Sequence, residues 1–550
     1  MAEITKMTLV VRDIPLGVRF LRVLSKKCCP LLHFNREVCY RSSVLLLTYI
    51  SYMCYHLSRK PISVVKPVLH HSSDHNSTMS DWAPFDGSDA DAATLLGTLD
   101  SAFLFAYAFA MFASGFVAER VNLRYFLSLG MLFSGVASYL FGIARSYDIH
   151  SMTYFIVVQI FGGICQTTGW PGVVTVVGKW FGKGKRGLIF GIWNSHTSIG
   201  NILGSLIASK YVETDWSNCF IVPGLIMGFV GFILYLFLVV NPMDVGLQTP
   251  DAPENNKRNY RRLEDQVANV ESPYEDNNSD VDDTEILIGD QDALRYRNSD
   301  FEVQRRVNER SYLLRNQSNS EEEAAIGFVD ACKIPGVIEF SLSLFFSKLV
   351  SYTFLYWLPL YLANSKNITA KDSAEMSTLF DVGGIVGAIA AGLISDYSGM
   401  SASTCVGMLM MAAPMMFIYQ HFASISMNIN MFLLILVGIL VNGPYALITT
   451  AVSAELGTHS SLRGNSKALA TVTAIIDGTG SIGAGVGPFL AGLVYSYGWN
   501  NVFYMLIASD IIALVLLLRL VKQEISKYKQ HRRENRIGTV QGIFAKFYDN

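Results

Sequence analysis

Charged side chains are scarce in this chain. Only 16% of its 550 residues are Asp, Glu, Lys or Arg, whereas 51% are hydrophobic, and the mean hydropathy is positive. Soluble domains have about 25% charged residues. The composition therefore excludes an ordinary soluble globular protein and indicates an integral membrane protein. The formal net charge of -2 carries little information, because the positions of the charges matter more than their sum.

Motifs of catalytic, cofactor and metal sites are also missing from the sequence. The eight cysteines are scattered without metal-ligand spacing, and no phosphate-loop pattern Gly-x-x-x-x-Gly-Lys-(Ser/Thr) occurs. The apolar runs contain no nucleophile–base pair, so we expect neither an enzyme nor a bound cofactor or metal. The basic loops fit membrane orientation rather than nucleic-acid binding. Cys28-Cys29 is either an acylation site beside the membrane or a pair of free cytosolic thiols.

What the sequence has instead is long apolar runs. A helix needs about 20 apolar residues to cross a bilayer, and hydropathy predicts about twelve such spans. The predicted spans cover residues 43–69, 94–118, 124–145, 152–178, 187–210, 218–241, 334–363, 374–395, 401–420, 428–452, 466–494 and 500–521. We expect an all-α protein that lies in the lipid bilayer.

Loop charges predict the orientation of these spans. The N-terminal arm (1–42) and the tail (522–550) are basic, whereas the first loop (70–93) has five Asp residues and no Lys or Arg. Both termini are therefore expected in the cytoplasm, which requires an even number of spans. The sequons at Asn76 and Asn367 then fall on the opposite side, where glycosylation takes place.

The chain divides into two similar halves. Residues 243–327 are polar and predict a disordered cytoplasmic linker between six-helix bundles at 43–242 and 328–521. The small-residue motif at 198–204, in the fifth span, recurs at 481–487 in the eleventh. Its glycines either pack helices closely or contact a ligand. Repeated halves place a substrate site near the midplane between them.

Two adjacent cations lie inside the first span. Arg59 and Lys60 have apolar residues on both sides, and the same run contains no acidic residue. A charge inside a membrane is costly and marks a ligand or ion path. Arg59 therefore either binds a phosphate group through its guanidinium fork or forms an intramembrane ion pair. Lys60 points about 100° away on a helix, where it either shares the anion or faces an acid such as Glu339 or Asp477.

Several motifs resemble those of a known transporter family. The loop after the second span, with Gly115, Glu119 and Arg120, resembles the loop signature of the major facilitator superfamily, and Asp396 ends the matching eighth span. The stretches at 55–60 and 169–194 resemble the organophosphate:phosphate antiporter branch. The longer stretches at 346–359 and 475–483 resemble the animal sugar-phosphate exchangers.

This resemblance implies a fold and an activity. The expected fold is the major facilitator fold, with twelve transmembrane helices in two pseudo-symmetric bundles. The expected activity is exchange of glucose-6-phosphate or glycerol-3-phosphate for inorganic phosphate by alternating access, by a monomer in the endoplasmic reticulum membrane. A facilitator for another organic anion and a non-transporting scaffold or receptor remain alternatives.

The resemblance also implies roles for individual residues. In the family the Arg at position 59 grips the phosphate. The second cation of bacterial members aligns with Ser351, which has no charge, and Lys348 lies one helical turn earlier on the same face. Asp477 is either a counter-charge for a cation in the empty site or a cap at a helix break.

Further residues are candidates for the walls of the substrate cavity. The family's histidine in the fifth span aligns with Thr197, and His196 is adjacent to it, so that His196 is either a ligand or a structural residue. The remaining candidates are polar or aromatic side chains that hydrogen-bond a sugar or line the cavity, namely Trp193, Asn194, Tyr55, Tyr352 and Tyr445.

Overall fold

The computed structural model describes residues 13–28, 35–70, 82–118, 120–181, 193–247, 328–366, 368–457 and 468–548, and these residues form helices and no strand. The chain divides into two compact units. One unit, residues 14–241 and 326–550, contains all the α-helices named below. In the other, residues 1–13 and 242–325, the structure describes Asp13 and residues 242–247, with a short 3₁₀ helix η2 (Pro242–Val245). Most of the predicted linker thus lies outside the described residues.

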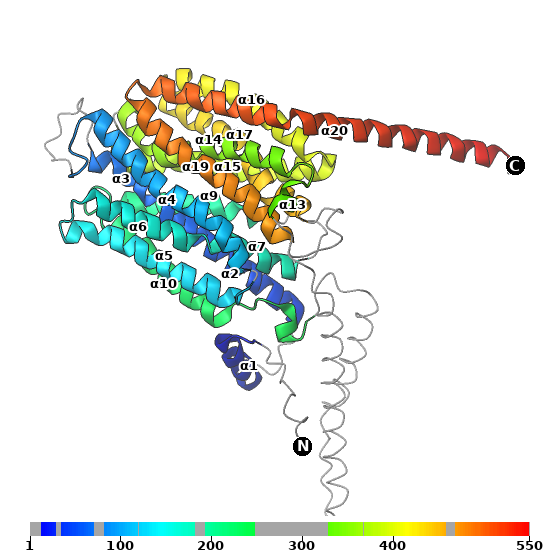
Figure 1. Ribbon diagram of the computed structural model, residues 1–550, viewed down its shortest axis with the longest axis horizontal. Helices are drawn as coiled ribbons and strands as arrows, with labels where there is room; N and C mark the ends of the chain where they lie inside the picture. The colour runs from blue at the N-terminus through cyan, green and yellow to red at the C-terminus, as the bar shows by residue number, and fades with distance from the viewer. Residues whose placement is uncertain are drawn as a thin grey trace, which may run out of the picture. The chain divides into compact units, whose positions relative to one another are not determined.

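The first half of the helical unit corresponds to the first six predicted spans (Figure 1). Its helices are α1 (Leu16–Cys28), α2 (Arg36–Arg59), α3 (Pro61–Leu69), α4 (Asp89–Ala118), α5 (Leu123–Ser146), α6 (Met152–Gln166), α7 (Gly169–Trp180), α9 (Ser195–Tyr211) and α10 (Asn218–Phe237). α2 and α3 together make the first span, and α6 and α7 the fourth.

The second half corresponds to the last six predicted spans. Its helices are α13 (Phe328–Cys332), α14 (Val337–Lys366), α15 (Ala370–Ser398), α16 (Ser401–Phe422), α17 (Met427–Leu447), the π-helical segment η3 (Ile448–Val452), α18 (Ser453–Leu456), α19 (Ala468–Tyr495) and α20 (Trp499–Tyr548). α20 packs on α16 and continues beyond it, so the predicted tail is helical as far as Tyr548 (Figure 1).

The described helices account for all twelve predicted spans. Eight of them are individually long and apolar enough to cross a membrane. The other four are the first span (α2 and α3 together), the fourth (α6 and α7 together), the fifth (α9) and the eleventh (α19). α2 has 24 residues, but its polar and charged residues lower its hydropathy, and the fourth span is divided into two short helices. α9 has only 17 described residues, and α19 is rich in glycine, which lowers its hydropathy. These features, rather than missing spans, explain the difference in number.

Local signals fix the ends of several helices. The Asn35 side chain caps α2 by accepting a hydrogen bond from the Glu37 backbone N–H at 3.1 Å. Pro61 occupies the first position of α3, where its missing N–H costs nothing. Gly399 ends α15 in the left-handed conformation (φ 65°), which glycine adopts without strain. The break between α2 and α3 falls at Lys60, between Arg59 and the proline.

In each half, the fifth span packs on the first span of the same half, and the two contacts are alike. α9 packs on α2, and α19 packs on α14. A Cβ at Gly204 would lie 2.5 Å from the Leu57 carbonyl oxygen, and a Cβ at Gly487 would lie 2.5 Å from the Leu349 carbonyl oxygen. The glycines of the repeated motif therefore sit at close helix–helix contacts. This register matches Leu57 with Leu349, and hence Arg59 with Ser351.

The halves also contact each other directly. α4 packs on α19, α9 on α15, and α3 on α14. Ser101 of α4 donates a hydrogen bond to the Gly485 carbonyl of α19 at 3.0 Å. The first and fifth spans of the first half therefore face the second half, and the polar residues they carry lie at this boundary.

Replacing Gly487 by Ala tests the glycine contact. The added methyl has no room against the Leu349 carbonyl, so we expect a loss of about 1–3 kcal/mol in stability. Gly407→Ala is the matched control, because a Cβ there meets open space. Thermal unfolding of the purified variants should show a lower midpoint for Gly487→Ala only. Equal midpoints would contradict the proposed role of the motif.

A buried cation site between the two halves

Arg59 ends α2 and is almost completely buried, with 4% of its surface exposed. Its Nε donates to Gln166 Oε1 at 2.7 Å, and its Nη1 lies 3.5 Å from the Tyr352 hydroxyl of α14. The guanidinium centre lies 4.7 Å from the centre of the Tyr107 ring and 5.6 Å from that of Phe103. Aromatic faces and neutral oxygens thus surround the charge.

No carboxylate of the described residues neutralises Arg59. Its Nη2 atom is buried and has no hydrogen-bond partner among them, and the guanidinium takes part in no ion pair there. The intramembrane ion pair, one of the two expectations for this residue, is therefore not formed within the described chain. A buried charge without a counter-ion is unfavourable.

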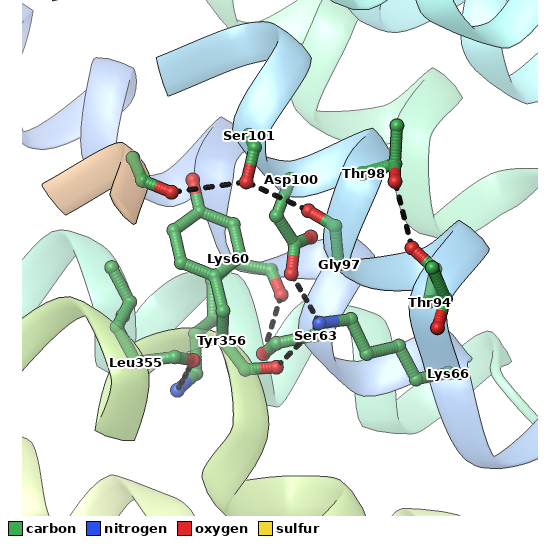
Figure 2. A network of polar contacts seen from close by, with 11 residues as sticks. Lys60, Ser63, Lys66, Thr94, Gly97, Thr98, Asp100, Ser101, Leu355 and Tyr356 are labelled. Carbon is green, nitrogen blue, oxygen red and sulfur yellow. Dashed lines mark hydrogen bonds and ion pairs between the residues drawn. The ribbon is translucent and has the colours of Figure 1, made fainter. Parts of the chain in front are cut away.

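Lys60 also lies in the boundary between the halves. Its Nζ donates to the Leu355 carbonyl of α14 at 3.2 Å (Figure 2). The two acids expected as possible partners are engaged elsewhere, since Glu339 binds Arg519 at 3.1 Å and Asp477 binds Lys348. Neither named acid is therefore the partner of Lys60, and the acid whose charge acts on this cation is Asp381.

Lys66 is a third cation of the first span that sequence reasoning missed. Its Nζ forms a fully buried ion pair with Asp100 of α4 and donates to the Tyr356 carbonyl at 3.0 Å (Figure 2). It lies 4.4 Å from the centre of a Trp357 ring. Asp100, a carboxylate in the middle of the second span, was the signal that could have revealed it. The pair joins α3 and α4 to the backbone of α14.

Lys348 lies in α14, the first span of the second half. Its Nζ contacts Asp477 Oδ1 at 2.6 Å and Ser481 Oγ at 3.3 Å. Ser351, one turn further along, donates to Asn442 Oδ1 at 2.6 Å. Asp477 thus forms a buried ion pair with Lys348. It lies inside the continuous helix α19, so it does not cap a helix break.

A cavity of about 460 Å³ lies between the halves. Its walls come from α2 and α9 on one side and from α14, α15 and α17 on the other, with Asn194 at the start of α9. Of the candidate residues, Asn194, Tyr352 and Tyr445 line it. Its other polar lining residues include His56, Asn201, Ser351, Asp381 and Asn442.

The remaining aromatic candidates lie in packed surroundings instead. The His196 ring centre is 4.4 Å from that of Trp193 and 4.8 Å from that of Tyr52. The Tyr55 hydroxyl lies 3.2 Å from Thr168 Oγ1. None of His196, Trp193 and Tyr55 is among the residues that line the cavity between the halves. Thr197, where the family has its histidine, does line it.

A second cavity of about 420 Å³ touches Arg59 directly. It lies mainly in the first half, between α2, α4, α5 and α6, and Gln166 and Tyr356 also line it. Tyr352, which contacts Arg59 Nη1, lines the first cavity. The guanidinium therefore lines the second cavity and contacts a residue that lines the first.

The candidate loop residues lie away from these cavities. Gly115 is buried near the end of α4, and Asp396 is exposed in α15. Arg120 folds back over the Phe116 ring and donates to its carbonyl at 2.8 Å. Glu119, Asn76 and Asn367 lie outside the described residues. Within the described chain no group of three or more His, Cys, Asp or Glu residues is placed to hold a metal ion.

The Lys66–Asp100 pair makes a testable contribution to stability. Lys66→Met leaves Asp100 charged and buried without its partner, and such losses cost about 3–5 kcal/mol. Adding Asp100→Leu removes that uncompensated charge, so we expect the double variant to regain most of the lost stability. Thermal unfolding in detergent measures both. A double variant as unstable as the single one would contradict this interpretation.

Comparison with known proteins places the fold in a family. The chain matches the Major Facilitator Superfamily over residues 48–469 and again over 341–545. It is 50% identical over 513 residues to the glucose-6-phosphate exchanger SLC37A2 of Bos taurus, and the alignment covers 90% of this chain and 97% of that protein. It is 46% identical over 544 residues to the glucose-6-phosphate exchanger SLC37A1 of Mus musculus, and this alignment covers 93% of this chain and 97% of that protein.

Solved structures show the same fold at low sequence identity. The crystal structure of a D-xylose-proton symporter aligns with a TM-score of 0.55 at 10% identity, over 87% of this chain and 97% of that one. A bacterial homologue of the human lysosomal transporter Spinster aligns with a TM-score of 0.54 at 15% identity, over 89% of this chain and 98% of that one. The chain is therefore a multi-pass membrane protein that belongs to the major facilitator superfamily.

Proposed function

We propose that this protein is a secondary-active antiporter that exchanges a sugar phosphate, glucose-6-phosphate or glycerol-3-phosphate, for inorganic phosphate by alternating access. The observation that carries the proposal is Arg59, a buried guanidinium with an unpartnered Nη2 and no ion-paired carboxylate among the described residues. The names of the relatives, which are glucose-6-phosphate exchangers, support the same substrate class.

The proposed binding step uses one cation from each half, Arg59 of the first span and Lys348 of the seventh. A phosphoryl head is mono- to dianionic near neutral pH, because its second pKa is about 6. It offers an acceptor to Arg59 Nη2 and competes with Asp477 for Lys348. Inorganic phosphate and a sugar phosphate share this head, so one site serves both.

The same charges explain why transport would be coupled exchange. Without an anion, Arg59 remains an uncompensated charge in a buried place, which disfavours any occluded empty state. With an anion bound, the charge is neutralised and the two halves can rock about the site. The small-residue contacts of α9 on α2 and of α19 on α14 keep each half compact while it moves as one body.

Replacing Arg59 by Ala tests the proposal in proteoliposomes loaded with phosphate. Loss of a buried, charged hydrogen-bond donor costs about 2–5 kcal/mol, so labelled phosphate exchange should fall about 30-fold or more. Arg519→Ala is the control, because this side chain is mostly exposed and bonds to Glu339 away from the cavities. Near-normal exchange by correctly inserted Arg59→Ala protein would disprove the proposed site.

We further propose that the protein works as a monomer in the endoplasmic reticulum membrane, with residues 1–42, 243–327 and 522–550 in the cytoplasm. The basic arm and tail and the acidic first loop support this orientation. Asn76 would then lie in the lumen, within a glycosylation sequon.

The orientation predicts a glycan on the first loop. Protein made in cultured cells should move faster in gel electrophoresis after enzymatic removal of N-linked glycans, and Asn76→Gln should remove all or part of that shift. Asn316→Gln is the control, since its sequon lies in the proposed cytoplasmic linker. A shift that depends on Asn316 would place the linker on the luminal side and reverse the orientation.

A further inference from the structure

Asp381 presents to the cavity between the halves a carboxylate with one unpartnered oxygen, on which the charge of Lys60 acts without a direct ion pair. It lies in α15, has 3% of its surface exposed, and is the only acidic side chain among the residues described as lining this cavity. Its Oδ1 accepts a hydrogen bond from Asn201 Nδ2 of α9 at 2.8 Å, and its Oδ2 is buried without a partner among the described residues. No cation forms an ion pair with it there.

Amide groups from both halves stand beside this carboxylate. Asn201 Oδ1 accepts no hydrogen bond of normal geometry in the described chain, although the His56 side chain interacts with this amide. Asn442 of α17 accepts from Ser351, which leaves its Nδ2 free of protein partners among the residues described. A Cβ at Gly384 would lie 2.9 Å from Asn442 Nδ2 and 3.0 Å from Ser198 Oγ, so α9, α15 and α17 converge here.

The polar groups of Asp381, Asn201 and Asn442 indicate which kind of ligand fits beside them. A carboxylate repels phosphate oxygens, so Asp381 cannot be part of the anion site even though Tyr352, a contact of Arg59, lines the same cavity. Hydroxyl groups both donate and accept. Two acceptors, Asp381 Oδ2 and Asn201 Oδ1, and one free donor, Asn442 Nδ2, therefore match adjacent hydroxyls of a polyol.

We infer that Asp381, Asn201 and Asn442 form a subsite for the hydroxyl groups of a hexose phosphate, separate from the cations that hold its phosphoryl head. The inference rests on the proposed function and extends it. Glycerol-3-phosphate has fewer hydroxyls than the hexose and offers these three groups fewer ways to pair, so we expect the subsite to favour the hexose.

Ligand binding by purified protein tests the subsite without relying on transport. Inorganic phosphate, glycerol-3-phosphate and glucose-6-phosphate are each titrated while ligand-induced thermal stabilisation is followed. Wild type should bind glucose-6-phosphate more tightly than phosphate. Asp381→Asn should weaken glucose-6-phosphate binding about 10- to 100-fold and change phosphate binding less than about threefold, because phosphate has no hydroxyl ring to contact this subsite.

Two further variants make the result unambiguous. Asp510→Asn is the matched control, because Asp510 is a buried carboxylate of α20 with an unpartnered Oδ2 that lines neither cavity. It should leave both affinities unchanged. Asn442→Ala, which removes the amide donor, should reproduce the selective loss if Asp381→Asn fails to fold.

Other outcomes separate the subsite from the proposed function. Equal weakening of phosphate and glucose-6-phosphate in Asp381→Asn indicates a structural link between α9 and α15 and overturns the inference, as does an unchanged preference. Binding of phosphate that requires sodium in wild type but not in Asp381→Asn would identify a cation site and also overturns it. Selective hexose phosphate binding without any exchange in vesicles leaves the subsite in place and refutes the antiporter.

Discussion

A guanidinium that the described chain buries without an ion-paired carboxylate is the constraint on which the rest of the structure depends. Arg59 ends α2 immediately before the break at Lys60 and Pro61, and hydrogen bonds from its Nε and Nη1 fix it between Gln166 and Tyr352. Desolvating such a charge is costly. The nearby cations of the first and seventh spans are compensated differently, Lys66 by Asp100 and Lys348 by Asp477. Arg59 is thus the cation that most needs an external anion.

The duplicated fold explains where this charge stands. In each half the glycines of the fifth span contact backbone carbonyls of the first span, at Leu57 in one half and at Leu349 in the other. This shared register makes Ser351 the counterpart of Arg59, so the symmetry of the backbone is not matched by symmetry of charge. Lys348 restores a cation one turn earlier, but Asp477 pairs with it. The equivalent spans of the two halves therefore carry an unpaired guanidinium in one half and a paired ammonium in the other.

The sequence predicted the parts of this account that depend on periodicity and on residues near one another in the chain. Twelve apolar runs, the recurring small-residue motif and the pair at Arg59 and Lys60 all follow from local pattern. The partners of these residues could not be predicted, because they come from other helices. Lys60 donates to the Leu355 carbonyl, which no side-chain pattern reveals. Asp381 meets Asn201 only through the packing of α15 on α9. Lys66 and Asp100 were visible as intramembrane charges, but their pairing depends on how α3 and α4 pack.

The sharpest test of anion binding at Arg59 is a structure determined by electron cryomicroscopy with saturating inorganic phosphate. We expect tetrahedral density between the two halves, with an oxygen about 3 Å from Arg59 Nη2 and with Lys348 drawn away from Asp477. Phosphate density far from Arg59, with Nη2 facing lipid or paired with a carboxylate, would contradict anion binding at this residue.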